Sequence, residues 1–266
     1  MNASPSPPCV LTIAGSDSSC GAGVQADVKS ITALGGYGLN ALTSVVSETP
    51  GKVSAIQCLP PEFIADQMQV LFNGFPIAAA KTGMLGGIDQ VQAVVATWIT
   101  IGKNIPLVVD PVMVATGGGR LLDEDAIDTV TTLLFPLAKV ITPNLDEAAV
   151  LWGDPVTTRA EMETCGHDLA TAHGCAVLVK GGHLTGDTAA DVLCEGGKSR
   201  WFESERVPGV HTHGTGCSYS AAIATGLAKG LLLHEAVGAA KTFVARAIAQ
   251  HFAWNEVHAL NHFAQP

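Results

Sequence analysis

The chain has few charged residues and no long apolar run, and both shortages limit what it can be. Charged residues make up 14% of its 266 residues, against roughly 25% in typical soluble domains. This shortage is typical of a fold whose central strands are covered on both faces, and it also favours a subunit interface. No apolar run reaches the roughly 18 residues that a membrane helix needs, so we expect no membrane span.

Positive charge is scarce as well, and the formal net charge is therefore −10. Such a balance argues against broad affinity for nucleic acid or for anionic membrane surfaces. An acidic protein can still bind phosphates where backbone amides and a few cations surround them. We therefore expect neither nucleic acid nor a membrane among its partners.

The seven cysteines form no C-x-x-C pair, and their number is odd. This argues against a disulfide framework or a zinc knuckle. It favours a reducing compartment, so we expect a cytoplasmic protein. Residues 1–8 are rich in proline and serine and lack the basic and apolar regions of a signal peptide. We expect them to be a disordered tail before a single domain over 9–266.

Apolar runs of strand length alternate with stretches of helical period along the chain, which predicts an α/β fold with a wound, mostly parallel sheet. In such sheets ligands bind beyond the carboxyl ends of the strands, where this chain carries its polar motifs. The expected strands are 10–14, 39–46, 78–82, 107–109, 140–142 and 176–179, with a hairpin of 190–195 and 198–203. The expected helices are 24–34, 61–72, 89–101, 123–134, 146–151, 159–173, 217–229 and 234–253.

The most informative segment is 211–218, which reads His-Thr-His-Gly-Thr-Gly-Cys-Ser and precedes an apolar helical run. Gly214 and Gly216 carry no Cβ, so the backbone can turn sharply and approach a ligand. Amides at the helix start, with the helix dipole behind them, suit a phosphate. Cys217 lies in this cup, where we expect a lowered pKa. The alternative is a glycine turn before a core helix with a small buried cysteine.

The loop 14–23 after the first strand can wrap a small polar ligand and direct Asp27 toward it. It does not match G-x-G-x-x-G, and the chain contains no G-x-x-x-x-G-K-[ST], so dinucleotide and Walker-type sites are weak hypotheses. The alternative is a glycine-rich turn, with Asp27 merely favourable in the first turn of the helix.

Other candidate ligands follow the later strands. Asp110 can hold Mg²⁺ through water or polarise a nucleophile, and Lys180 can reach a phosphate or simply be solvated. Asn144 and Glu147 are three residues apart, which fits a capping box and also a site where Glu147 organises the waters of Mg²⁺. The glycine-rich segment 115–120 can move over a bound ligand.

These features together form the inventory that phosphoryl transfer needs, because its catalysis is mostly positioning and stabilisation of charge. They comprise an anion cup, a cation, a carboxylate suited to Mg²⁺ and two flexible loops at one sheet edge. His211 and His213 alternate without further ligands nearby in the sequence, which predicts no metal site there.

Several long motifs in a fixed order make the chain resemble the hydroxymethylpyrimidine/phosphomethylpyrimidine kinases of thiamine biosynthesis, in the ribokinase-like superfamily. The resemblance runs from about Val10 to Gln250. It is carried by the segments 14–17, 21–27, 81–86, 110–115, 142–144, 179–183 and 212–217. It implies a single-domain three-layer α/β/α fold. The implied activity is ATP-dependent phosphorylation, with Mg²⁺, of 4-amino-5-hydroxymethyl-2-methylpyrimidine to its monophosphate and then to the diphosphate.

The resemblance also implies roles for individual residues. The pyrimidine pocket is expected to be lined by Gly15, Ala22, Asp27, Glu48, Met84 and Val112. The expected nucleotide contacts are Lys180, Asn144 and Thr212, and the expected metal ligands are Asp110 and Glu147. The catalytic group is expected to comprise the anion-hole residues Gly214, Thr215 and Gly216, with Cys217 as the base. The wider superfamily usually has aspartate at the position of Cys217.

The chain departs from the family's pattern at three places. Residues 17–21 read Asp-Ser-Ser-Cys-Gly where the family usually has Asp-Pro-Ser-Gly-Gly, so Cys20 adds bulk and Ser18 frees the backbone. Glu48 stands where many members have glutamine, and an ionised carboxylate only accepts hydrogen bonds, which suits a protonated pyrimidine. Three glycines at 117–119 replace Lys-Ser-Gly, which predicts a more mobile, less cationic lid and a weaker second phosphorylation.

Two alternatives remain open beside this kinase. One is a kinase for pyridoxal or a related ring alcohol, although no cysteine lies in 112–120 to trap the pyridoxal aldehyde. The other is a non-catalytic pyrimidine-binding protein, against which the intact Cys217, Lys180 and Asp110 argue. The low charged fraction favours a homodimer.

Overall fold

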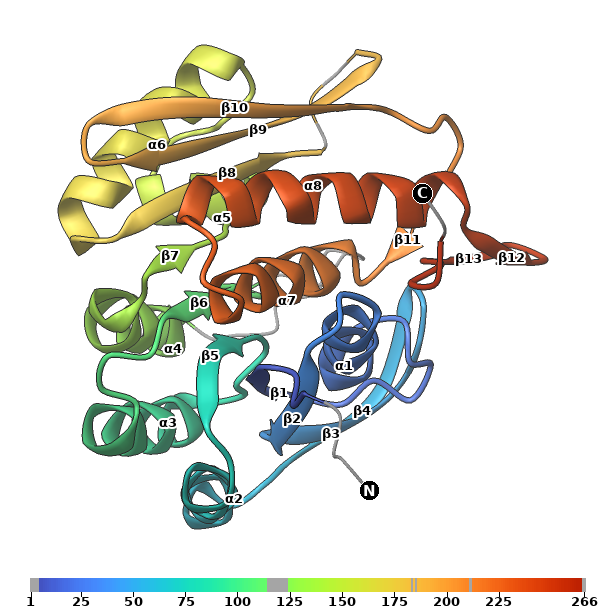
Figure 1. Cartoon of the computed structure of the whole chain (residues 1–266). Coiled ribbons are helices and arrows are strands. Elements are labelled where there is room, and N and C mark those ends of the chain that lie inside the picture. Colours follow the sequence, from blue (N-terminus) through green and yellow to red (C-terminus); the bar gives the residue numbers. More distant parts are fainter. Residues whose placement is uncertain (1–4, 114–123, 183, 185, 211, 265–266) are drawn as a thin grey trace.

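Eight strands form the central sheet of the chain, and their order positions the polar motifs at one edge. In the computed structural model, which describes residues 5–113, 124–182, 184, 186–210 and 212–264, this sheet lies between two layers of helices (Figure 1). Its strands are β1 (Cys9–Ala14), β2 (Tyr37–Leu42), β5 (Ile77–Thr82), β6 (Leu107–Val109), β7 (Val140–Ile141), β8 (Ala176–Gly181), β9 (Thr188–Glu195) and β10 (Lys198–Glu205).

The strand order is β10-β9-β8-β7-β6-β5-β1-β2. The six strands from β8 to β2 run parallel, and β9 and β10 pair antiparallel at one edge. The predicted three-layer α/β/α fold with a mostly parallel sheet is therefore confirmed. The predicted hairpin of 190–195 and 198–203 is also confirmed, as β9 and β10.

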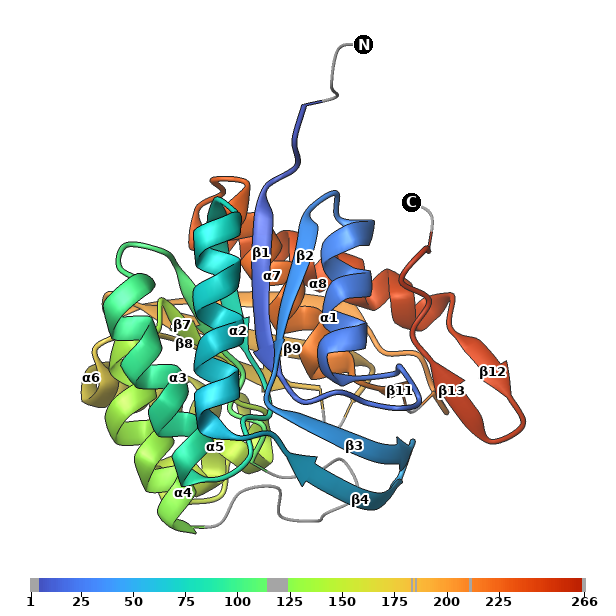
Figure 2. The same ribbon diagram turned by 90° about the horizontal axis from the view of Figure 1, so that it is seen from below.

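Helices cover the two faces of the sheet, and the alternation along β1 shows why both faces need cover (Figure 2). Leu11 and Ile13 point into one core and Val10 points into the other, as the period of a strand requires. One face is covered by α1 (Gly23–Ala33), α7 (Thr215–Ala228) and α8 (Leu233–Ala249). The other is covered by α2 (Pro61–Gly74), α3 (Ile88–Ile101), α4 (Glu124–Thr129), α5 (Leu145–Trp152) and α6 (Arg159–His173).

A two-stranded hairpin stands apart from the central sheet and differs from the predicted strand 39–46. That segment divides into β2 and β3 (Ser44–Thr49), and β3 pairs with β4 (Lys52–Cys58). Thr43 lies between them and donates its Oγ1 hydrogen to the carbonyl of Met84 at 2.8 Å. Nearly all of β4 is exposed, so it carries no apolar alternation by which a strand could be predicted.

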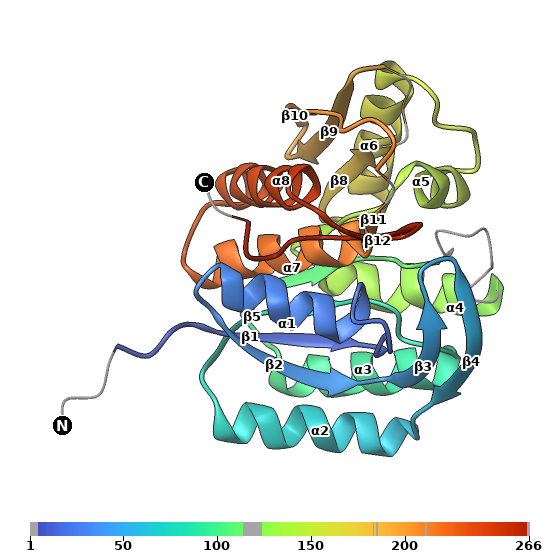
Figure 3. The ribbon, with the colours of Figure 1, turned by 90° about the vertical axis from the view of Figure 1, so that its right-hand side faces the viewer.

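The C-terminal segment also differs from its prediction. The helix expected over 234–253 ends at Ala249, and the chain continues into β12 (Phe252–Trp254) and β13 (Val257–Ala259) (Figure 3). Asn255, between these strands, has a φ of 52°, which suits a tight hairpin turn. β13 also pairs in parallel with β11 (Thr212–His213), so the end of the chain is attached to the segment that precedes α7. Within the described residues, the structure contains no helix of the length and hydrophobicity that a membrane span requires.

Candidate active site

Polar residues that follow several strands meet at the carboxyl edge of the sheet, where ligands of such folds bind. The loop 15–23 follows β1, Met84 follows β5, Asp110 follows β6 and Asn144 follows β7. Lys180 is the penultimate residue of β8 and forms an isolated parallel bridge with Asn144. The topology therefore brings together residues that are far apart in the sequence.

An ion pair between Lys180 and Asp110 lies at the centre of this edge. Lys180 Nζ is 2.9 Å from Asp110 Oδ1, to which Thr142 Oγ1 also donates at 3.2 Å. Ser220 Oγ donates to the other oxygen at 3.3 Å. Burial alone would raise the pKa of Asp110, but the ammonium groups of Lys180 and Lys81 outweigh it and lower that pKa. The sequence predicted both residues at this edge but not the ion pair between them, and the two hydroxyl donors carry no sequence signal.

The first turn of α7 begins beside this ion pair, and its N-cap residue is a glycine, which has no side chain to cap the helix. Gly214 is its N-cap with a φ of 80°, and a Cβ there would collide with the carbonyl oxygen of Gly21, so glycine is required. A Cβ on Gly216 would lie 3.1 Å from Lys180 Nζ. The amides of Thr215 and Gly216 thus belong to a helix start that approaches an ammonium group, as a phosphate site requires.

The thiol of Cys217 lies at the same helix start, but its pKa moves opposite to the expected direction. Burial raises the pKa of Cys217 to about 11; the Lys81 ammonium opposes this, and the carboxylates of Asp27 and Asp110 reinforce it. The expected lowering of this pKa is therefore wrong. The helix dipole does favour a thiolate, but removal of the sulfur from water costs more than the dipole supplies.

Asp27, expected to line the pyrimidine pocket, is fully buried and paired with Lys81. The Lys81 Nζ lies 2.9 and 3.0 Å from the two carboxylate oxygens, and Thr12 Oγ1 donates to Asp27 Oδ2 at 2.5 Å. Burial alone would lower the pKa of Lys81, but the Asp27 carboxylate outweighs it and raises that pKa. Lys81 is a neighbour of Cys217 to which the sequence analysis gave no role, although it begins segment 81–86, one of the motifs that carry the resemblance.

Asn144 and Glu147 form the capping box that their spacing predicted. Asn144 Oδ1 accepts from the Glu147 amide at 2.9 Å, and Glu147 Oε2 accepts from the Asn144 amide at 2.9 Å. The second oxygen, Oε1, accepts from the Met113 amide at 3.2 Å. Burial raises the pKa of Glu147, against the nearby Lys180 ammonium. The two alternatives of the sequence are compatible, since the box holds Glu147 beside Lys180.

Asp17, Glu48 and His213 form a cluster whose acceptor atoms lie within 4.8 Å of one another. His213 Nε2 is 3.1 Å from Asp17 Oδ2 and 4.0 Å from Glu48 Oε2. Asp17 Oδ2 already accepts from the amides of Gly21 (3.0 Å) and Ala22 (2.7 Å) as well as from His213. These hydrogen bonds make Asp17 and His213 a junction between two loops, with Glu48 beside it.

Charge in this junction is balanced between the histidine and its neighbours. The hydrogen bond to Asp17 raises the pKa of His213, and the charges of Asp17 and Glu48 act in the same direction. Burial raises the pKa of Glu48, as does the Asp17 carboxylate. The link from His213 to Asp17 was not expected from the sequence.

Two of the departures in the first loop have local structural explanations. Ser18 Oγ donates to the carbonyl of Glu48 at 2.7 Å and accepts from its amide at 2.8 Å, so this hydroxyl holds β3 beside the loop. A proline could do neither. Cys20 has a φ of 58°, the left-handed conformation that a glycine adopts more easily. The serine therefore holds the backbone that carries Glu48, whereas the cysteine adds strain.

The other residues expected around the pyrimidine adjoin this junction. The Gly15 amide donates to the carbonyl of Met84 at 3.0 Å, and Ala22 is the N-cap of α1. Val112 has a φ of 44°, an outlier for a β-branched residue and the kind of strain that clusters at ligand sites. Thr212, an expected nucleotide contact, lies in β11 opposite His258. The lid expected at 115–120 lies outside the described residues. So do His183 and His211.

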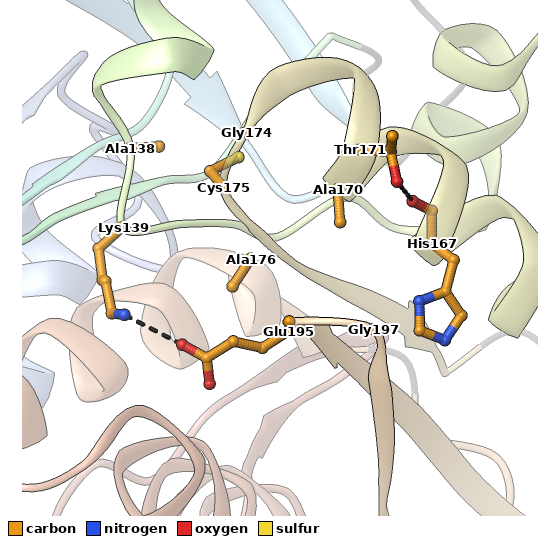
Figure 4. Close-up of a pocket in the computed structure, with 11 residues that line it drawn as sticks. Ala138, Lys139, His167, Ala170, Thr171, Gly174, Cys175, Ala176, Glu195 and Gly197 are labelled. Carbon is orange, nitrogen blue, oxygen red and sulfur yellow. Dashed lines mark hydrogen bonds and ion pairs between the residues drawn. The ribbon is translucent and has the colours of Figure 1, made fainter.

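A hollow lies at the opposite edge of the sheet, where β7 and β8 begin, and has a volume of about 430 Å³ (Figure 4). Its two charged residues are Lys139 and Glu195, which pair with each other at 3.0 Å. Cys175 also lines it, and burial raises the pKa of that thiol to about 11. No charge in this hollow is left to recognise a ligand, so the carboxyl edge is the candidate active site.

Comparison with known proteins agrees with this choice. The family model described as phosphomethylpyrimidine kinase matches residues 17–262. A hydroxymethylpyrimidine/phosphomethylpyrimidine kinase of Streptomyces coelicolor is 42% identical over 246 residues, which cover 92% of this chain and 90% of that protein. The thiamine biosynthesis bifunctional protein ThiED of Geobacter sulfurreducens is 42% identical over 239 residues, which are 90% of this chain and 49% of that protein.

Among solved structures, an ADP complex of pyridoxal kinase from Bacillus subtilis is similar to this chain with a TM-score of 0.90. The two are 37% identical, and the match covers 97% of this chain and 98% of that one. At this identity the likeness extends beyond the fold to the family.

Proposed function

Because the chain belongs to the phosphomethylpyrimidine kinase family, we propose that its carboxyl-edge site phosphorylates 4-amino-5-hydroxymethyl-2-methylpyrimidine and then its monophosphate, with ATP as donor. The chain is an ATP-dependent kinase of thiamine biosynthesis. The observation that carries the site assignment is the approach of the start of α7 to a lysine, because a Cβ on Gly216 would lie 3.1 Å from Lys180 Nζ. That junction unites an anion hole and a cation, the two stabilisers of a phosphoryl group in transfer.

The phosphate end of the site is assigned by charge. Lys180 contacts the phosphates of the nucleotide, with Asn144 and Thr212 beside it. The amides of Gly214, Thr215 and Gly216 stabilise the negative charge of the moving phosphoryl group. Support comes from the convergence of these residues at the carboxyl edge, and from the ADP complex of a 37% identical pyridoxal kinase.

Cys217 is assigned to the acceptor hydroxyl, and its side chain is a neutral thiol in the resting state. With a pKa of about 11, about one molecule in a thousand carries a thiolate at pH 8. In a loose transition state the hydroxyl loses its proton late, so a strong resting base is unnecessary. The amide stabilisation therefore contributes more than the base. The thiol first releases its own proton to solvent, and the small thiolate fraction accepts the proton of the hydroxyl as formation of the P–O bond makes that hydroxyl acidic.

Magnesium fits the donor set of the phosphate end. Asp110 and Glu147 offer hard carboxylate oxygens, which Mg²⁺ takes together with waters and substrate phosphates. Both carboxylates act on Lys180, so negative charge from two side chains gathers where the ion would bind. We assign Asp110 and Glu147 as the residues that would hold the ion, which when bound would neutralise charge on the ATP phosphates.

The acceptor pocket is assigned to Gly15, Ala22, Asp27, Glu48, Met84 and Val112. Glu48 is the residue that selects the ring. Its carboxylate can accept from the exocyclic amino group and from a protonated ring nitrogen together, a bidentate pair that a neutral pyridine alcohol lacks. The raised pKa of Glu48 supports this role, because the carboxyl can share its proton with the ring.

A pyridoxal kinase is the second candidate, favoured by the 0.90 TM-score to such an enzyme. The two candidates predict different results in a competition assay with both acceptors present. Pyrimidine kinase relatives at 42% identity favour the first. The absence of cysteine from 112–120 favours it too, because no thiol is available there for the aldehyde of pyridoxal.

A homodimer in a reducing compartment completes the proposal. Exposed apolar side chains on the β3–β4 hairpin, among them Val45 (50% exposed), and on the C-terminal hairpin, among them Trp254 (60% exposed), support a subunit contact. The seven cysteines are free thiols, which supports the cytoplasm. Sedimentation of the purified protein distinguishes a dimer from a monomer.

Incubation of the purified protein with Mg-ATP and the hydroxymethylpyrimidine, with products resolved by mass, tests the function. A diphosphate product is expected. A monophosphate alone would assign the second step elsewhere, and turnover of pyridoxal without turnover of the pyrimidine would select the second candidate.

A further inference from the structure

His262 is a buried histidine that the proposed chemistry does not use. The residue is 4% exposed, and it follows β13 near the end of the chain. The Nε2 atom lies 2.9 Å from Oγ of Ser218, a fully buried residue. Ser218 is the residue after Cys217, so the C-terminal segment reaches the first turn of α7.

The direction of this hydrogen bond follows from the state of the ring. Burial lowers the pKa of His262 to about 4, with a further contribution from the Lys29 ammonium, so the ring is neutral at pH 7. A neutral imidazole has one donor and one acceptor nitrogen. A hydrogen bond with the Leu260 backbone favours the protonated ring, so its carbonyl takes the one N–H. Nε2 therefore accepts the hydroxyl hydrogen of Ser218.

This acceptor decides what the Ser218 hydroxyl does inside the helix. A helical serine otherwise donates to the carbonyl four residues earlier, which tends to bend the helix. Ser220 does so in part, because it shares its one hydroxyl hydrogen between the Gly216 carbonyl, at 3.0 Å, and Asp110 Oδ2, at 3.3 Å. For Ser218 the corresponding carbonyl belongs to Gly214, the N-cap, and it accepts the Ser218 amide at 3.0 Å. With its hydroxyl held by His262, Ser218 leaves that first helical hydrogen bond unshared.

The C-terminal segment is itself fixed, so it can act as a support. Its strand β13 pairs with β11, which immediately precedes Gly214. The Asn261 amide donates to the carbonyl of Ala247 in α8 at 3.1 Å. The Phe243 ring, also in α8, lies 6.3 Å from the His262 ring. The chain before Gly214 and the chain after Cys217 are thus both held by the same anchored segment.

We propose that His262 is a positioning residue, which through Ser218 fixes the first turn of α7 against Lys180 and Asp110. The proposal rests on the phosphoryl transfer assigned to this site. Transfer of this kind depends on positioning, and a displacement of about 1 Å can cost about a hundredfold in rate. The loss should appear in kcat, because the substrates bind mainly to other residues.

Three substitutions test this role. His262→Phe keeps an aromatic ring but removes the acceptor, Ser218→Ala removes the donor, and His262→Gln retains an acceptor oxygen at a similar reach. We expect His262→Phe and Ser218→Ala to lower kcat about tenfold, with KM for ATP and for the pyrimidine within about twofold of wild type. His262→Gln should recover most of kcat, and the double variant should be no worse than either single one. His234→Phe, at the start of α8, is the matched control.

A folded His262→Phe variant with wild-type kcat would overturn the proposal, as would a Gln variant no better than the Phe variant. Should His262→Phe fail to fold, the smaller change Ser218→Ala tests the proposal, and wild-type kcat in that variant would overturn it. Hydrogen exchange of the amides of 214–218 provides a test without turnover. Exchange should be faster in His262→Phe and Ser218→Ala but not in His262→Gln. Wild-type protein without kinase activity would refute the proposed function, whereas unchanged exchange and kcat would refute only the positioning role.

Discussion

At the scale of single residues, the neutral thiol of Cys217 is the least expected property of the site. Burial beside Asp27 and Asp110 raises its pKa to about 11, although the residue begins a helix and adjoins Lys81. Desolvation thus outweighs the helix dipole, and the local sequence contains no signal for how deeply the sulfur is buried. The pattern predicted which residue lies at the reacting centre but not its protonation state.

Cys217→Ala should lower kcat far more than it weakens ATP binding, since the thiol is assigned to the reacting hydroxyl and not to the nucleotide. The wild-type kcat should rise with pH up to pH 9 without a plateau near 7, because the thiolate fraction grows tenfold per pH unit below a pKa of about 11. Steady-state kinetics from pH 6 to 9 measure both effects. Turnover of the alanine variant at the wild-type rate would remove Cys217 as the base.

Glu48 gives a second prediction at this scale. Glu48→Gln should leave the fold unchanged, because Ser18 holds the backbone of residue 48 and not its carboxylate. Pyrimidine affinity should then lose the pH dependence that an ionisable partner confers. The wild type should bind more weakly as pH rises above the pKa of the protonated ring. Titration of the pyrimidine by calorimetry at pH 5.5 to 8.5 measures this, and superimposable profiles for the two proteins would refute the protonated-ring hypothesis.

At the scale of elements, prediction from the sequence succeeded where one local pattern determined the structure. Helix α6 (Arg159–His173) has the predicted bounds, since Thr158 and Glu161 form its capping box and Gly174 ends it with a φ of 67°. Strand β4 was missed because nearly all of it is exposed and it lacks alternation. Strand β12 was partly merged into the helix predicted over 234–253, and β13 was not predicted, because its pairing with β11 joins residues about 46 positions apart, which no local pattern reports.

The same dependence on long-range contacts explains which residues of the site the sequence could bring together and which it could not. Asp110, Lys180 and Glu147 each follow or end a predicted strand, so parallel topology alone placed them together. The junction of Asp17 with His213 spans 196 positions. No period or motif connects those residues, and only the folded chain shows that two loops share one carboxylate.

The two capping boxes at the starts of α5 and α6 offer a matched prediction. Asn144→Ala and Thr158→Ala each remove a side chain that accepts from a helix amide, so each should cost about 1 kcal/mol of unfolding free energy. Only Asn144→Ala should also reduce kcat, since its box holds Glu147 beside Lys180. Urea unfolding and steady-state kinetics on both variants provide the test. Equal activity in the two would mean that the Asn144 box is purely structural.

At the scale of the whole molecule, two histidines flank the anion-binding turn, and their pKa values are shifted in opposite directions. His213 joins it to the first loop, and its pKa is raised by the hydrogen bond to Asp17. His262 joins it to the C-terminal segment, and burial lowers its pKa to about 4. The turn is thus supported from one side by a group that prefers to be charged and from the other by one that must stay neutral.

The stability of the protein should therefore decline on both sides of neutrality for separate reasons. The contribution of His213 is fully present below its unfolded pKa of about 6.5 and is lost as pH rises through its higher folded value. His262 binds a proton more readily when unfolded, so stability falls as pH drops from about 6.5 toward 4, by at most about 3 kcal/mol. Urea unfolding from pH 4.5 to 9 should show a weaker alkaline decline in His213→Gln and a weaker acid decline in His262→Gln. Each variant is the control for the other, and a variant that altered both limbs equally, or neither, would contradict this division of roles.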